Sequence, residues 1–406
     1  MTEMRYGLRS TCQLDASALR VASPSRPIAN VDPLAAMRRA LAEPVDFPPL
    51  AQATVPGDRA VVAVADGVPQ RAAIALGALT GLVDAGVDVR HTTVLLQSEL
   101  EDPAAFRREL AARKLADVQL AVHDPADAQQ LAMVGVTEAG RPLRMNRLLA
   151  EADLTLPIAG RGSELLAPEA AARYAGLYPQ FADLADQRRF HAPDSDRPKS
   201  LPQRSADIEE AGWLMGVVVC AQAVPGAAGG VAAVFAGAPA SVAAAAGRCR
   251  DATWACRLPH RGDLALAAIA GDAETQSWNN LACAVETARS AVVSGGAVAV
   301  CCDLEEPPGP AVHQLRDALD WETASRRILR ERSADSRAAL LLVRALARGP
   351  VYLLSRLAAS TVEALGMTPI AGHEELNRLI RSYQRPLLLE DAPFLQPRGE
   401  GVLASP

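Results

Sequence analysis

The feature that most constrains the fold is a strand, helix and strand succession between residues 60 and 97. The run "AVVAVA" at residues 60–65 is apolar and rich in valine, which is typical of a strand buried on both faces. A helical pattern from about residue 70 to 85 follows and ends at Gly86, and "VRHTTVLLQ" then reads as a second strand. Two strands joined through a helix by short links form a parallel crossover unit. This part of the chain therefore predicts an open α/β sheet.

The same alternation continues on both sides of this unit. A helix "PLAAMRRALA" precedes it, and "DPAAFRRELAARKL" and "VQLAVHD" follow as helix and strand, before "NRLLAEADLTLPIA" supplies one more of each. Residues 161–212 break the rhythm with many prolines and mixed charge. A segment of this kind, attached to strand ends, is either part of a binding site or a solvated connector.

The longest uncharged stretch, residues 211–247, has the apolar character of a membrane span but not its continuity. Pro225, Pro239 and several glycines interrupt it, and much of it is alanine. We interpret it as two strands joined by the turn "PGAAGG", followed by the helix "ASVAAAAGRCRDA". No membrane span is expected.

A second α/β rhythm begins near residue 258. Strands are expected at residues 263–270, at "AVAVCC", at "PVYLLS" and at "RPLLLE", with helices near 278–293, 312–348 and 373–383 and at "STVEAL". A chain of 406 residues is too long for one ordinary core. We therefore expect two α/β domains with mostly parallel sheets, residues 1–257 and 258–406, and a site in the cleft between them.

Composition excludes several classes of protein. The net charge of −6, without a basic block, argues against a nucleic-acid partner. The seven cysteines show neither the spacing of a CxxC motif nor histidines at the distances of a zinc finger, so we expect neither structural zinc nor a disulfide framework. A reducing compartment fits this cysteine usage best. The N-terminal residues lack the apolar core of a secretory signal. These features predict a cytoplasmic protein, and they leave the oligomeric state undetermined.

Standard nucleotide-binding and hydrolase motifs are missing, so the candidate site residues come from the strand ends. Ligands of open α/β sheets bind beyond the carboxyl ends of the strands, where this sequence places Asp66 and Gly67, residues 97–102, residues 160–164 and residues 272–280. Asp66 is either a ligand group or a helix N-cap. Gln276 and Asn280 are likewise either ligand groups or caps of the helix expected near residue 278.

At this point the sequence resembles a known family. The succession "VDPLAAMRRALAEPVDFPPL", "GDRAVVAVADGVPQ", "RMNRLLAEADLTLPIA", "VAAVFAGAPASVAAAAG" and the "GD…Q…N" loop before "SGGAVAVCC" resembles the nickel-dependent lactate racemases, to about residue 395. The resemblance implies two α/β domains with the site between them. It also implies interconversion of 2-hydroxy acid enantiomers by hydride transfer through a nickel pincer nucleotide, which a lysine anchors and a histidine ligates.

The family's acid–base positions are changed in this chain. Of the Asp-His-Thr-Arg-Pro motif only Asp66 is kept, with Arg71 as the stand-in for the arginine. The two proton-transfer histidines fall on Glu101, once Pro103 is set on the family's proline, and on Glu164. Carboxylates can act as acid and base where burial or repulsion raises a pKa. The alternative is that both are ordinary exposed acids.

The cofactor positions are changed as well. The nickel histidine lands on Phe190, one place from His191, which is our only candidate metal ligand. Tyr174 stands where the family has the anchoring lysine, and Lys114 and Lys199, the two lysines of the chain, lie elsewhere. These replacements argue against a lysine-tethered nickel pincer nucleotide, so the cofactor stays open.

Polar residues for a carboxylate ligand remain. Arg173 takes the position of a family arginine, Gln276 matches a family glutamine, and a later glutamine and lysine meet Asn280 and Cys283. Arg161, at the end of a predicted strand, is a further candidate clamp for a carboxylate or phosphate. Together with Asp66, Arg71 and Tyr174, these residues form the predicted substrate-binding set.

Our first hypothesis is a diverged lactate racemase-like protein that racemises or epimerises a small 2-hydroxy or polyhydroxy carboxylate in the cleft. The second is a ligand-binding protein that keeps the cleft but has lost the reaction. Whether the chain is an enzyme is therefore left open, and a small carboxylate is the expected partner in both cases.

Overall fold

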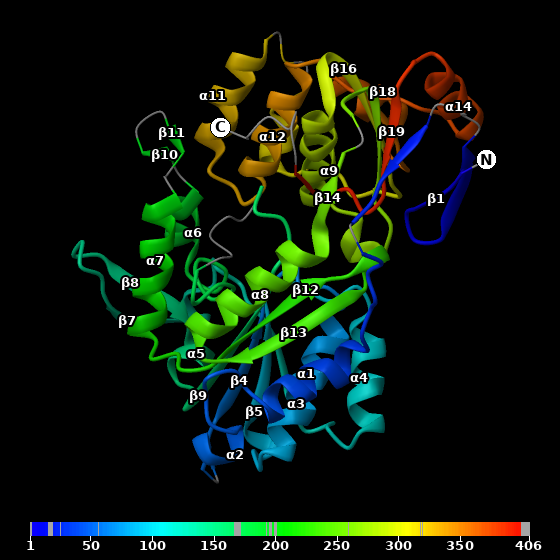
Figure 1. The fold of residues 1–406 in the computed structure, drawn as a ribbon. Coiled ribbons are helices and arrows are strands. Elements are labelled where there is room, and N and C mark those ends of the chain that lie inside the picture. The colour runs from blue at the N-terminus through cyan, green and yellow to red at the C-terminus, as the bar shows by residue number, and fades with distance from the viewer. Residues whose placement is uncertain are drawn as a thin grey trace.

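The buried run at residues 60–64 is the strand β4 (Ala60–Val64) inside a six-stranded sheet (Figure 1). The computed structural model describes residues 2–14, 19–24, 26–55, 57–165, 172–191, 193–194, 197–198, 201–258, 260–316, 318 and 320–398. The strands of this first sheet are, in order, β13 (Val231–Gly237), β12 (Cys220–Pro225), β9 (Leu154–Gly160), β4, β5 (Thr92–Leu96) and β6 (Gln119–Val122). All neighbours pair in parallel except β12 and β13, which form the predicted hairpin.

Helices cover the first sheet because each presents an apolar stripe to it. On one face pack α1 (Pro33–Ala42), α3 (Arg71–Asp84) and α4 (Pro103–Ala112), with Met37, Leu79 and Phe106 among their buried side chains. Asp32 and Asp102 cap α1 and α4, each followed by a proline at the first helical position. The other face carries residues 172–182 and the helices α5 (Arg147–Ala150), α6 (Leu184–His191) and α7 (Leu201–Leu214).

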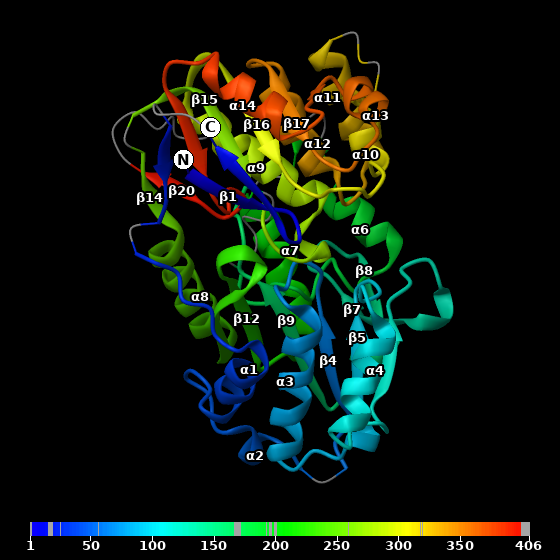
Figure 2. The same cartoon turned by 90° about the vertical axis from the view of Figure 1, so that its right-hand side faces the viewer.

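The second sheet is entirely parallel and lies in the upper half of Figures 1 and 2. Its strands are, in order, β18 (Thr368–Pro369), β17 (Val351–Leu354), β16 (Val292–Cys301), β15 (Gly262–Ala268), β19 (Pro386–Leu389) and β3 (Arg20–Ala22). One face packs against α9 (Trp278–Ala291), α10 (Pro310–His313), α11 (Trp321–Glu331), α12 (Ser336–Leu346) and α13 (Ala359–Ala364). The other face packs against α14 (His373–Arg381) and the hairpin of β1 (Thr2–Tyr6) and β2 (Ser10–Leu14).

The beginning of the chain belongs with its end. Strand β3 is the edge strand of the second sheet, and the Tyr6 hydroxyl lies 2.6 Å from His373 Nε2 of α14. The chain then passes to the first sheet and returns after α8 (Pro239–Trp254), where β14 (Ala255–Arg257) pairs with β20 (Gln396–Arg398). An isolated bridge between Pro24 and Cys256 joins the outgoing and returning segments. We call the units around the two sheets the first and second lobe; the division at residue 257/258 stays a prediction.

The α/β class with two mostly parallel sheets is confirmed, and most predicted elements are present within one to three residues of their expected bounds. The expectation of irregular structure at 161–212 is incomplete, because α6 and α7 lie there, with the short β10 (Pro193–Asp194) and β11 (Arg197–Pro198) between them. The hairpin of β7 (Leu131–Val136) and β8 (Pro142–Asn146) was not expected either. In the part of the chain that the structure describes, no helix combines the length and apolar composition of a membrane span.

Candidate functional site

The turn from β4 into α3 carries an arginine that joins the two lobes. Arg71 is 5% exposed, and all three of its nitrogens donate hydrogen bonds. In the first lobe it donates to Asp66 Oδ1 at 2.5 Å, to Ser98 Oγ at 3.1 Å and to the Glu99 carbonyl at 2.7 Å. In the second lobe it donates to Glu274 Oε1 at 3.0 Å. Burial raises the pKa of Glu274, although the Arg71 charge opposes this shift.

A second set of contacts lies beside Arg71. The Gln70 amide donates to Asp272 Oδ2 at 2.8 Å and to the Gly229 carbonyl at 3.0 Å. Asp391 accepts a hydrogen bond from the Ala228 amide at 3.0 Å, and its burial raises its pKa to about 6. We call Asp66, Gln70, Arg71, Asp272 and Glu274 the latch, because they connect the strand ends of both sheets.

A different cluster forms where β9 ends. Glu164 Oε1 lies 3.1 Å from Arg161 Nη2 and 3.0 Å from Arg250 Nη1 of α8. The side chains of the two arginines are only 5% and 6% exposed, whereas Glu164 is 46% exposed. Burial and the neighbouring Arg250 charge lower the pKa of Arg161. We call Arg161, Glu164 and Arg250 the arginine cluster.

The arginine cluster has hydrogen-bonding capacity left over. Among the described residues, Arg161 Nε and Nη1 have no hydrogen-bond partner, and neither does the Gln222 amide, through its nitrogen or its oxygen. The Arg250 Nη1 contact with Glu164 is an ion pair by distance without hydrogen-bond geometry. Buried polar groups are normally paired, so these atoms mark a place where a ligand or water would be bound.

Three other predicted residues of the first lobe, Glu101, Arg173 and Tyr174, belong to neither cluster. Glu101 is exposed in the bend between β5 and α4. Arg173 is exposed and pairs with Glu209 of α7 at 2.5 Å. The Tyr174 ring packs so closely on α7 that a Cβ atom on Gly212 would lie 2.1 Å from it. Their roles in binding or catalysis stay predictions.

In the second lobe the two predicted amide side chains bind nearby backbone. Gln276 Oε1 accepts from the Asp303 amide at 2.8 Å, and the Asn280 side chain donates to the Thr275 carbonyl at 2.9 Å. The N-cap of α9 is Ser277, so neither amide side chain caps this helix. Asp66 does not cap α3 either, because the capping position is held by residue 70 without a side-chain bond.

The described residues do not fit a lysine-tethered nickel cofactor. His191 lies at the end of α6, where burial and the Arg204 charge lower its pKa to about 4, so the ring is neutral at pH 7 and free to act as a ligand. However, no group of three His, Cys, Asp or Glu side chains that could hold a metal occurs in the described ranges. Tyr174 provides no amine, and Lys199 lies outside the described residues.

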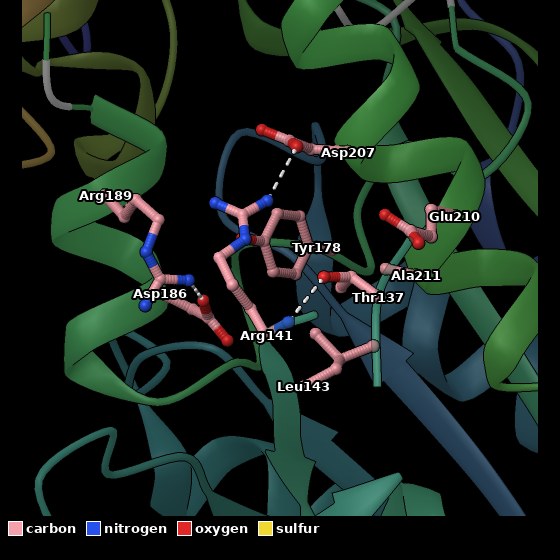
Figure 3. Close-up of a pocket in the computed structure, with 9 residues that line it drawn as sticks. All are labelled: Thr137, Arg141, Leu143, Tyr178, Asp186, Arg189, Asp207, Glu210 and Ala211. Atoms are coloured by element: carbon pink, nitrogen blue, oxygen red, sulfur yellow. Dashed lines mark hydrogen bonds and ion pairs between the residues drawn. The ribbon is translucent and has the colours of Figure 1, made fainter. Parts of the chain in front are cut away.

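A hollow on the first lobe is too small for a substrate (Figure 3). It has room for about one water molecule. Ion pairs fill its wall, between Arg141 and Asp207 at 3.5 Å and between Arg189 and Asp186. Burial and the two aspartates raise the pKa of the Tyr178 hydroxyl beyond its usual range. This hollow is therefore a small gap within a network of ion pairs on the first lobe.

Four residues of these clusters were not among the predicted site residues, namely Gln70, Asp272, Glu274 and Arg250, and neither was Gln222 of β12. Asp272 and Glu274 are part of the "GDAETQSWNN" loop, but their pairing with the first lobe depends on how the lobes meet. No local sequence pattern marks Arg250 as a site residue. Gln222 could have been found from the sequence, because it is the single amide side chain within the uncharged stretch "VVVCAQAVP".

Comparison with known proteins agrees with this architecture. Residues 8–160 match the family model described as the lactate racemase N-terminal domain. The structure is similar to the lactate racemase apoprotein from Thermoanaerobacterium thermosaccharolyticum, with a TM-score of 0.76 and 15% identity over 98% of this chain and 100% of that one. It is also similar to a structural-genomics protein from Thermotoga maritima, with a TM-score of 0.62 and 13% identity over 91% of this chain and 100% of the other. None of the curated proteins compared with the sequence matches it. Residues 8–160 are therefore similar in sequence to the lactate racemase N-terminal domain, and nearly the whole chain shares the fold of the lactate racemase apoprotein.

Proposed function

We propose that this chain racemises or epimerises a small 2-hydroxy or polyhydroxy carboxylate at the arginine cluster. The observation that carries the proposal is the buried guanidinium of Arg161, beside Glu164 at the end of β9, two of whose nitrogens have no hydrogen-bond partner among the residues that the structure describes. A guanidinium with free N–H groups in a dry environment is suited to bind a carboxylate. The carboxyl end of a parallel strand is also where α/β proteins bind ligands.

We assign the substrate carboxylate to Arg161 rather than to Arg71. Every nitrogen of Arg71 already donates to an acceptor in the latch, so a substrate would have to displace Glu274 or Asp66. Arg161 needs no such displacement. The latch then serves to hold the lobes together around the site.

Inversion at carbon 2 requires that a proton leave from one face and return to the other. In the proposed reaction Glu164 is the base on one face, within reach of a ligand bound to Arg161. Glu101, in the bend after β5, is the proposed partner for the other face. The guanidinium neutralises the substrate carboxylate, which makes removal of the neighbouring proton less unfavourable.

Isotope exchange tests this assignment directly. The protein is incubated in D₂O with each enantiomer of a panel of 2-hydroxy and sugar acids, and loss of the carbon-2 proton is followed by NMR alongside chiral chromatography of the product. Glu164→Gln should lower turnover by about 10²- to 10⁴-fold and abolish exchange from one enantiomer, while Glu101→Gln abolishes it from the other. Glu151→Gln, an exposed acid of the same lobe, is the matched control.

Two results would contradict the proposal. Undiminished turnover in Glu164→Gln removes Glu164 from the reaction. Binding of carboxylates to the wild type, with neither exchange nor turnover on any member of the panel, would instead establish a ligand-binding protein without this chemistry.

A further inference from the structure

Gln222 is a deeply buried amide on the strand next to β9, the strand that leads into the arginine cluster. It lies on β12, is 1% exposed, and has no hydrogen-bond partner for its amide nitrogen or oxygen among the described residues. Its strand neighbours Ala221 and Ala223 are fully buried and apolar. An amide buried in this way destabilises the fold unless a bound group pairs with it.

The register of the sheet places Gln222 close to Arg161. Gln222 pairs with Ala159 of the adjacent strand β9, and Arg161 follows two residues later, where its backbone N–H donates to the Ala223 carbonyl at 2.7 Å. Residues two apart on a strand, and residues paired across parallel strands, share one face of the sheet. Gln222 and Arg161 therefore point to the same side, and their free atoms do not bond to each other.

We propose that Gln222 is a specificity-determining residue, whose amide binds a hydroxyl group of the ligand that Arg161 holds by its carboxylate. This inference rests on the proposed function. The carboxylate supplies acceptors, which suit the free Arg161 nitrogens. The Gln222 amide offers a donor and an acceptor, and a hydroxyl group satisfies both because it accepts and donates. A ligand with a carboxylate alone would leave the Gln222 oxygen unpaired.

Lactate and propionate form a matched pair that differs by this hydroxyl. Isothermal titration should show that the wild type binds lactate about 10- to 100-fold more tightly than propionate. In Gln222→Met the preference should fall to within about twofold, with propionate affinity retained. The ligand-free variant should also unfold about 1–2 °C higher than the wild type, because an unpaired buried amide has been removed.

Gln187→Met is the matched control, because the Gln187 amide donates to the carbonyls of Gln180 and Ala182. It should unfold at a lower temperature and keep the lactate preference. Equal binding of lactate and propionate by the wild type, or a preference that persists in Gln222→Met, overturns the role of Gln222 and leaves the proposed function standing. Absence of binding of both ligands would instead remove the carboxylate site at Arg161, and the Gln222 role with it.

Discussion

The latch gives the most direct prediction about how the lobes are held together. Arg71→Met keeps an apolar stem of similar length and removes every hydrogen bond from Arg71 to Asp66, Ser98, Glu99 and Glu274. Breaking a buried ion pair costs about 3–5 kcal/mol. The partners remain partly hydrated, with 46% and 28% of the Asp66 and Glu274 side chains exposed, so we expect about 2–4 kcal/mol.

Calorimetry measures this loss of unfolding free energy as a fall in the midpoint temperature of unfolding. At about 2.1 cal/mol/K per residue, the unfolding entropy of 406 residues is about 0.85 kcal/mol/K, so the midpoint should fall by about 2–5 °C. Arg38→Met is the control, because Arg38 and Asp84 form an ion pair at 2.5 Å whose side chains are 54% and 46% exposed. An exposed pair contributes less than about 1 kcal/mol, or about 1 °C here.

Two further measurements locate the effect. Hydrogen exchange should increase at residues 97–99 and 271–275 in Arg71→Met, because both segments lose a contact with the guanidinium. Without the Arg71 charge the pKa of Glu274 should rise further, so the deficit of the variant should shrink as the pH is lowered. Equal losses in the two variants, or unchanged exchange in both segments, would refute the latch.

Three further predictions follow from burial and backbone geometry. The pKa of Asp391 rises from 3.8 to about 6 on folding, so its contribution to stability falls by about 2 kcal/mol between pH 4 and 7. Asp391→Asn should abolish this part of the pH dependence in denaturant titrations. Gly7→Ala should destabilise by more than about 2 kcal/mol, since its Cβ would lie 2.1 Å from Asp303 Oδ2, whereas Gly140→Ala, with open space around it, should cost about 1 kcal/mol. Cys249, the one described cysteine that is not fully buried, should react first with a thiol reagent at pH 7, and a faster buried thiol would contradict the packing.

Much of the fold could be predicted because its central elements carry local signals. The β-branched run of β4, the proline and aspartate that begin α1 and α4, and the "PGAAGG" turn of the hairpin are short-range patterns. Strand β3 could not be predicted in its place, because its three residues are ordered by pairing with β19, more than 350 residues away in the chain.

The candidate site also contains residues that could be predicted from local sequence and residues that could not. Asp66, Arg161 and Glu164 follow strands, so their position at the sheet edge could be inferred from the sequence. Arg250, which pairs with Glu164, and Glu274, which pairs with Arg71, come from elements that meet these residues only in the folded protein. Contacts of this kind have no local signal, and the sequence therefore suggested single candidate residues rather than the two clusters.

Strand β3 belongs to the second sheet and β4 to the first, so the chain crosses between the lobes once before β4 and once after α8, and the Pro24–Cys256 bridge places the two crossing segments side by side. Two adjacent linkers restrict the relative motion of the lobes more than a single linker would. We expect the lobes to open by rotation about one hinge axis that passes through both linkers. A fragment starting at residue 258 would lack its edge strand and expose the backbone of β19 to other chains.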